Sequence, residues 1–158
     1  MKFSILIANY NNGKYFGDCY HSIISQTYPD WEAIIVDDCS TDDSLVQISL
    51  LIANDDRFKL VTNAKNEGCG FTKRRCADLA MGEICGFVDP DDTISSNAIE
   101  LMVNAHNKHT DVALIHSNFC YCNEKMDMLY IFSKGKHVQV NEKLFVERSN
   151  VSKIGSFE

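Results

Sequence analysis

No stretch of this sequence is apolar over the length that a membrane-spanning helix needs, and residues 1–20 lack the apolar core of a signal peptide. Basic residues are scarce relative to acidic ones: 15 Lys and Arg stand against 22 Asp and Glu, a formal net charge of −7. Because binding to nucleic acid without sequence preference needs a basic face, this balance argues against a nucleic-acid partner. We expect a cytoplasmic protein with no membrane span in this chain. Peripheral attachment to the inner face of the membrane, through residues outside the chain, is compatible with the sequence.

The patterns that mark zinc sites and disulfide frameworks are also missing. The seven cysteines contain no CxxC pair, and the five histidines show neither HxxxH nor HExxH spacing. An odd number of scattered cysteines is typical of reduced thiols in the core and on helix faces. We therefore assign no cysteine or histidine to chemistry.

What the chain does contain is an alternation of strand-like and helix-like segments. Strands are expected at residues 3–8, 32–37, 58–61, 83–88 and 111–121, and 128–132 can pair with the last. Helices are expected at about 16–24, 45–52, 71–81 and 98–106, with hydroxyls at 40–41 and 95–96 as caps and Gly82 as a stop. This order predicts an α/β fold, a single domain with a mostly parallel sheet and helices on both faces. Residues 133–158 alternate weakly and end without a capped element, so we expect the domain to be incomplete at its C-terminus.

Two acidic clusters directly follow apolar runs. Asp37 and Asp38 end the second expected strand, and Asp89, Asp91 and Asp92 follow the fourth. Open α/β sheets hold ligands at the carboxyl ends of their strands, so the clusters indicate a site for a metal ion and a polar, phosphorylated ligand. In an extended segment Asp89 and Asp91 would face the same way and could share Mg²⁺ or Mn²⁺, which usually takes further ligands from phosphate and water. The alternative for both clusters is a structural one: acidic turns that support the start of the next helix.

The densest basic run, Lys73–Arg75, falls on an expected helix between the two acidic clusters. At least one of its side chains could reach a diphosphate, because cationic side chains form charge-assisted hydrogen bonds with phosphate oxygens. A solvated helix face is the alternative interpretation for each of the three residues.

Taken in order, several short motifs resemble the opening of the family 2 glycosyltransferases. The motifs that carry the resemblance are Ser4–Asn11, Ser25–Glu32, Ile35–Asp42, Asn66–Gly68, Ala80–Glu83 and Phe87–Asp92. Each is weak alone, but the series is specific, and it covers residues 3 to about 105. The resemblance implies a GT-A (Rossmann-like) fold in which residues 1–107 bind a nucleotide-sugar donor and residues 108–158 begin an acceptor-side part.

The resemblance also implies roles for residues at the strand ends. Ala8, Asn9 and Tyr10 would cradle the base of the donor, with Tyr10 packing against it. The Asp37–Asp38 pair would accept hydrogen bonds from the donor, Asp38 from the base itself, which is most often uracil in this family.

For the acidic residues after the fourth strand, the resemblance implies that Asp89 lies near the ribose or the ion and that Asp91 is the main metal ligand. The cofactor would be Mn²⁺ or Mg²⁺, which would act as a Lewis acid on the departing diphosphate. The chain departs from the family pattern at Cys39, where glycine is usual, and at Thr72-Lys73-Arg74, where Ala-Arg-Asn is usual. Lys73 and Arg74 are both candidates to bind the donor, and the second departure leaves open which basic residue contacts the phosphate.

Family members transfer the sugar with inversion to a saccharide or lipid-linked acceptor, as in polysaccharide biosynthesis, and use a carboxylate as general base. In the family that carboxylate belongs to a later segment. Glu142 and Glu147 lie in the appropriate half, but their surroundings do not match the motif. We therefore expect this chain to carry the donor and metal site and identify no catalytic residue in it.

Two other classes fit less well. A sugar nucleotidyltransferase would need a glycine-rich, basic loop after the first strand, whereas residues 9–13 hold one glycine and no basic residue. A receiver-like signalling module would carry its acidic pair after the first strand and a lysine on the fifth. Here the pair follows the second strand, and residues 111–121 contain no lysine.

Overall fold

The structure, a computed structural model, describes residues 1–110, 112–117, 119–123, 128–132 and 144–147. The chain forms two compact units, Met1–Val103 and Asn104–Glu158. Among the described residues, no helix combines the length and the apolar composition that crossing a membrane requires.

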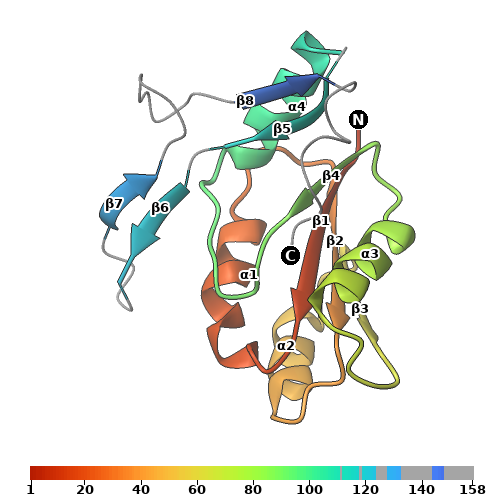
Figure 1. Ribbon diagram of the computed structural model, residues 1–158. Coiled ribbons are helices and arrows are strands. Elements are labelled where there is room, and N and C mark those ends of the chain that lie inside the picture. The colour runs from red at the N-terminus through yellow and green to blue at the C-terminus, as the bar shows by residue number, and fades with distance from the viewer. Residues whose placement is uncertain (111, 118, 124–127, 133–143, 148–158) are drawn as a thin grey trace. The chain divides into compact units, whose positions relative to one another are not determined.

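The first unit is built on a parallel sheet with the strand order β3-β2-β1-β4 (Figure 1). Its strands are β1 Phe3–Asn9, β2 Trp31–Asp37, β3 Phe58–Thr62 and β4 Ile84–Phe87. The central strands β1 and β2 are buried almost throughout, which explains their nearly continuous apolar sequences. Asn9 pairs with Asp37, and Asp37 with Thr62, so the carboxyl ends of the strands lie along one edge. The predicted parallel sheet is confirmed.

Helices cover both faces of this sheet, as predicted (Figure 1). A short 3₁₀ helix, Gly13–Tyr15, leads into α1 Phe16–Ile24, and the other helices are α2 Ser44–Ile52, α3 Cys69–Leu79 and α4 Ala98–Lys108. Alternate strand residues point to opposite faces. Ile5, Ile7 and Ile35 therefore pack with residues from α1, α2 and α4. Leu6, Ile34 and Val36 pack with Cys76 of α3 on the other face.

Gly82 does not end α3, contrary to expectation. The helix ends at Leu79, and Ala80 already has an extended backbone with ψ 139°. A Cβ atom on Gly82 would lie 2.6 Å from Ser4 Oγ and 2.7 Å from the carbonyl oxygen of Lys2. The glycine is therefore needed for the close approach of this turn to β1.

The expected hydroxyl caps are also wrong. At the start of α2 the N–H of Ser44 donates to the carboxylate of Asp42 (3.0 Å), while Ser40 Oγ donates to Asp37. In the first turn of α4 the N–H of Ile99 donates to Oε1 of Gln26, a residue that follows α1 (3.1 Å). The start of α2 is therefore held by a nearby aspartate rather than by a hydroxyl, and the start of α4 by a residue distant in the sequence.

The second unit holds two antiparallel pairs: β5 Val112–His116 with β8 Leu144–Glu147, and β6 Phe119–Cys122 with β7 Met128–Phe132. The expected pairing of residues 128–132 is confirmed. The expected continuous strand 111–121 is wrong, because β5 and β6 belong to separate sheets. Ser117, which follows β5, belongs to neither strand. Of the tail 133–158, only β8 lies within the described residues, and the proposed division at residues 107 and 108 stays a prediction.

Candidate functional site

Asp37, at the end of β2, is fully buried and fixes the turn that follows it. Its carboxylate accepts hydrogen bonds from Nδ2 of Asn9 (2.7 Å), from Oγ of Ser40 and from the N–H of Ser40 (2.8 Å). Asn9, at the end of β1, is only 1% exposed. These two expected donor-binding residues are thus brought together, and both serve the local structure. Their contact with a donor stays a prediction.

The turn after Asp37 needs a left-handed residue, and Cys39 supplies it with φ +60°. This is the position at which the sequence departs from the glycine usual in the resembling family. The turn is tied to the loop after β1: the N–H of Asn11 donates to Ser40 Oγ (2.9 Å), and the N–H of Thr41 donates to Asn11 Oδ1 (2.8 Å). The ends of β1 and β2 therefore form one hydrogen-bonded loop pair.

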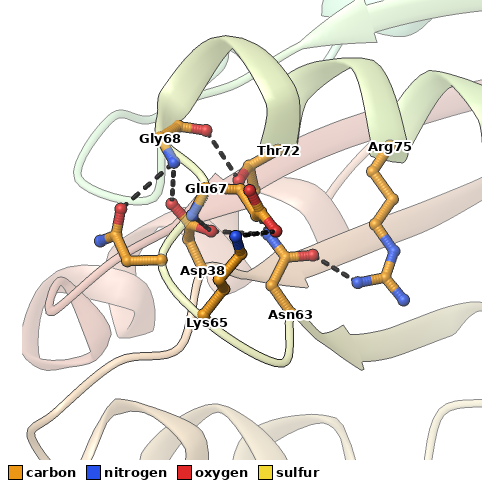
Figure 2. Close-up of polar contacts among 8 residues, drawn as sticks. Asp38, Asn63, Lys65, Glu67, Gly68, Thr72 and Arg75 are labelled. Atoms are coloured by element: carbon orange, nitrogen blue, oxygen red, sulfur yellow. Dashed lines mark hydrogen bonds and ion pairs between the residues drawn. The ribbon is translucent and has the colours of Figure 1, made fainter.

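Asp38 anchors a third loop, as Figure 2 shows. One of its oxygens accepts from Asn63 Nδ2 (2.6 Å) and from the N–H of Glu67 (2.9 Å), and the other accepts from the N–H of Gly68 (2.8 Å). Burial of Asp38 opposes its ionisation, but these hydrogen bonds outweigh it and lower its pKa. Gly68 has φ +87°, which glycine adopts without strain. Asp38 therefore holds the loop that leads into α3.

Asn63 and Thr72 belong to this network but were not assigned to the site from the sequence. Thr72 Oγ1 accepts from Asn63 Nδ2 (3.1 Å) and donates to the carbonyl oxygen of Gly68 (3.0 Å). Arg75 donates to Asn63 Oδ1 and to the carbonyl oxygen of Thr62 (3.2 Å). The polar Asn63, directly after an apolar strand, was the available signal, the same one that marks the acidic clusters.

The three basic residues of α3 point to three different partners. Lys73 Nζ lies 3.0 Å from Asp89 Oδ1, Arg74 pairs with Asp78 on the exposed face of the helix, and Arg75 joins the Asp38 network. Burial of Lys73 disfavours its charge, but the hydrogen bond and the charge of Asp89 prevail and raise its pKa. Lys73 is thus the member of the run that reaches the acidic residues after β4.

Residues 89–92 form a tight turn, in which the N–H of Asp92 donates to the carbonyl oxygen of Asp89 (3.0 Å). The extended geometry assumed for Asp89 and Asp91 is therefore wrong at this point, because Pro90 favours the second position of a turn. The three carboxylates remain close. Burial, and then the charges of Asp91 and Asp89, raise the pKa of Asp92. Burial, followed by the charges of Asp92, Asp91 and Asp89, raises the pKa of the Cys19 thiol to about 12.

The acidic turn suits a hard divalent cation chemically. It offers carboxylate oxygens and an excess of negative charge, which are what Mg²⁺ and Mn²⁺ prefer. Within the described part of the chain, no three His, Cys, Asp or Glu side chains form a ready cage for a metal. An ion held by Asp89 and Asp91 would need to complete its shell with water and with oxygens of a bound diphosphate.

Tyr10 follows β1 on the same edge and is 44% exposed, so its ring is available for stacking. Ala8 precedes it on β1 and is partly buried.

A hollow of about 480 Å³ lies at the opposite edge of the sheet, where Trp31, Glu32, Arg57 and Met81 are among its lining residues. None of the expected site residues at the carboxyl edge lines that hollow.

Comparison with known proteins identifies relatives of this chain. The family model described as Glycosyl transferase family 2 matches residues 4–152. The glycosyltransferase GlyG of Streptococcus pneumoniae is 31% identical over 148 residues, which make up 93% of this chain and 48% of GlyG. The chain thus spans about half the length of that relative.

Solved structures show the same fold. The crystal structure of S. aureus TarS 1–349 in complex with UDP-GlcNAc has a TM-score of 0.65 and 34% identity, covering 71% of this chain and 33% of that one. The mannosyltransferase PcManGT from Pyrobaculum calidifontis, solved with GDP-Man and Mn²⁺, has a TM-score of 0.63 and 21% identity, covering 78% of this chain and 36% of that one. The α/β architecture described above is shared with both.

Proposed function

Because this chain belongs to glycosyltransferase family 2, with the GT-A fold, we propose that its carboxyl edge binds a UDP-sugar and a divalent metal ion. The observation that carries the proposal is the convergence of the Asp38 loop, the Lys73–Asp89 pair and the acidic turn at that edge. The choice of uridine is supported by TarS, a relative described with UDP-GlcNAc. We further propose that the whole protein transfers the sugar with inversion to a saccharide or lipid-linked acceptor.

Each group would have a distinct task in donor binding. Tyr10 would stack on the base, and Asp38 would hold the base-side loop in shape and offer its remaining lone pair to the base. Asp89 and Asp91 would hold Mn²⁺ or Mg²⁺, which supplies Lewis-acid stabilisation of the leaving diphosphate.

Lys73 would exchange Asp89 for a phosphate oxygen, because its side chain is a third exposed and its ammonium group already lies at the turn. Arg74 stays a prediction as a donor ligand, since it pairs with Asp78 and its side chain is 79% exposed. We assign no general base among the residues that the structure describes.

Titration calorimetry with UDP, in Mn²⁺ and in EDTA, tests this proposal, with GDP as the control nucleotide. We expect binding of UDP to be strengthened by the metal and to exceed binding of GDP. Equal heats in both buffers would refute the metal site, and preference for GDP would refute the uridine assignment.

The acids can be ranked in the same assay. Asp91→Asn should weaken metal-assisted binding most, because a primary ligand loses its charge. Asp92→Asn is the matched control, with the same chemical change in the same turn, and should have a smaller effect. A larger effect of Asp92→Asn would contradict the assignment of Asp91 as the main ligand.

A further inference from the structure

The acidic turn belongs to an irregular segment, residues 88–97, between β4 and α4. Among the described residues, the backbone hydrogen bonds made inside this segment are short-range, such as Asp92 N–H to Asp89 and Ala98 N–H to Ser95; at its start, Val88 N–H still donates to the carbonyl oxygen of Leu6 in β1 (3.1 Å). A segment without a ladder of its own must be held from outside if its side chains are to bind a ligand with precision. One external contact is the pair of Asp89 with Lys73 of α3, and further contacts come from α1 and the residues directly after it.

Gln26 makes the central contact, and both ends of its amide take part. Nε2 donates to the carbonyl oxygen of Ser95 (2.7 Å) and to that of Ser22 (3.0 Å), and Oε1 accepts the N–H of Ile99 (3.1 Å). The bond to Ser22 orients the side chain against the end of α1, while the other two hold the end of the irregular segment and the first turn of α4. An amide side chain suits these three contacts, because it has two N–H donors on one atom and an accepting oxygen on the other.

Neighbouring residues extend the contact in both directions along the segment. Cys19 Sγ lies 3.8 Å from the carbonyl oxygen of Asp89, within the limit for a weak thiol hydrogen bond. Ser22 Oγ accepts the N–H of Ile94 (3.3 Å), and the N–H of Thr27 donates to the carbonyl oxygen of Ser96 (2.8 Å). Cys19 and Ser22, three residues apart, share one face of α1, and Gln26 lies just after the end of that helix. They meet the segment in chain order, from the acidic turn to α4.

We infer that Gln26 is a positioning residue for the acidic turn: by joining α1 to Ser95 and Ile99, it fixes where Asp89 and Asp91 stand. The inference rests on the proposed function, and it assigns a task to the Ser25–Glu32 motif that the function itself does not use. Gln26 would touch neither donor nor metal. Its effect would be pre-organisation, since a segment already held in place loses less conformational freedom on binding.

The test compares Gln26→Ala with wild type, by amide hydrogen exchange and by calorimetry with UDP and Mn²⁺, on the same chain well below its unfolding temperature. We expect faster exchange at Ile94 and Ile99, unchanged protection in β1 and β2, and UDP affinity weaker by about three- to tenfold, the size of one net hydrogen bond. Gln26→Glu, which keeps the acceptor for Ile99 but cannot donate to Ser95, should slow the exchange of Ile99 relative to Gln26→Ala and still weaken UDP binding.

Gln47→Ala is the matched control, because Gln47 makes its side-chain bond with Asp43 on the exposed part of α2. It should change neither measurement in the acidic segment. Faster local exchange with unchanged UDP affinity in Gln26→Ala would overturn the inference and leave Gln26 as a helix cap only, and loss of protection throughout the sheet would overturn it as well. If wild type bound no UDP, the proposed function would fail, while the exchange data would still report whether Gln26 holds the segment.

Discussion

Replacement of Asp38 by Asn tests whether this carboxylate stabilises the fold or binds the ligand directly. Asp38 is 3% exposed and accepts three hydrogen bonds, two of them from the backbone N–H groups of Glu67 and Gly68. Asparagine keeps one accepting oxygen, but its NH₂ group would face a donor on the other side. Hydrogen bonds to a charged group contribute about 1.5–3 kcal/mol each, so losing at least one should lower the free energy of unfolding by roughly 2–4 kcal/mol.

Urea unfolding at neutral pH measures this loss. Asp56→Asn is the matched control, because the side chain of Asp56 is exposed and makes no hydrogen bond to any residue that the structure describes. It should change stability within about 0.5 kcal/mol. A near-native Asp38→Asn that had lost UDP binding would refute the structural role and make Asp38 a direct ligand of the base.

The pH dependence provides a second check. The pKa of Asp38 is lowered in the folded protein, so its contribution is present above the unfolded pKa of about 3.9. This stabilising contribution is lost as the pH falls through the pKa that Asp38 has in the folded protein. The stability difference between wild type and Asp38→Asn should therefore be full at pH 6–7 and shrink below about pH 4. A difference that stayed constant down to pH 3 would contradict the ionised state.

Two glycine-related substitutions test the loops at the same edge. Cys39→Gly should stabilise the protein by about 0.5–1 kcal/mol in thermal melts, because glycine adopts φ +60° without the Cβ penalty; a loss of stability would show that the thiol makes a compensating contact. Gly13→Ala should destabilise by about 1–3 kcal/mol, since its Cβ would lie 2.4 Å from Ser44 Cα. Gly17→Ala, with nothing within 4 Å of the added Cβ, is the control and should be neutral or stabilising.

The strands and their common edge could be predicted because one property, the burial of apolar runs on both faces of the sheet, decides them. An apolar run that is buried on both faces has to be a central strand, and a carboxylate directly after it has to lie at the strand end, as Asp37 and Asp38 do. The same reasoning, applied to Asn63 after β3, would have added that residue to the site. Parallel pairing then aligns the ends without further information.

The partners of those residues could not be predicted, because they are far apart in the sequence. Asp38 bonds the backbone of residues 67 and 68, and α4 begins on Gln26 rather than on a nearby serine. A rule that considers only neighbouring residues cannot identify partners this far apart in the sequence. The turn at 89–92 is different, since Pro90 followed by two aspartates is a turn signature that the interpretation as an extended segment overrode.

Glu32 has a consequence for how the sheet assembles. It pairs in register with Ser4 and accepts hydrogen bonds from Ser4 Oγ (2.6 Å) and from the N–H of Met81 (2.7 Å), although the residue is only 8% exposed. A one-residue slip of β2 would turn this carboxylate to the other face, and a two-residue slip could set it beside Leu6. Either error would bury a charge without partners, at a cost of about 3–5 kcal/mol. A single acidic residue, remote from the ligand edge, thus selects the correct strand alignment during folding and so determines which side chains arrive together at the other end.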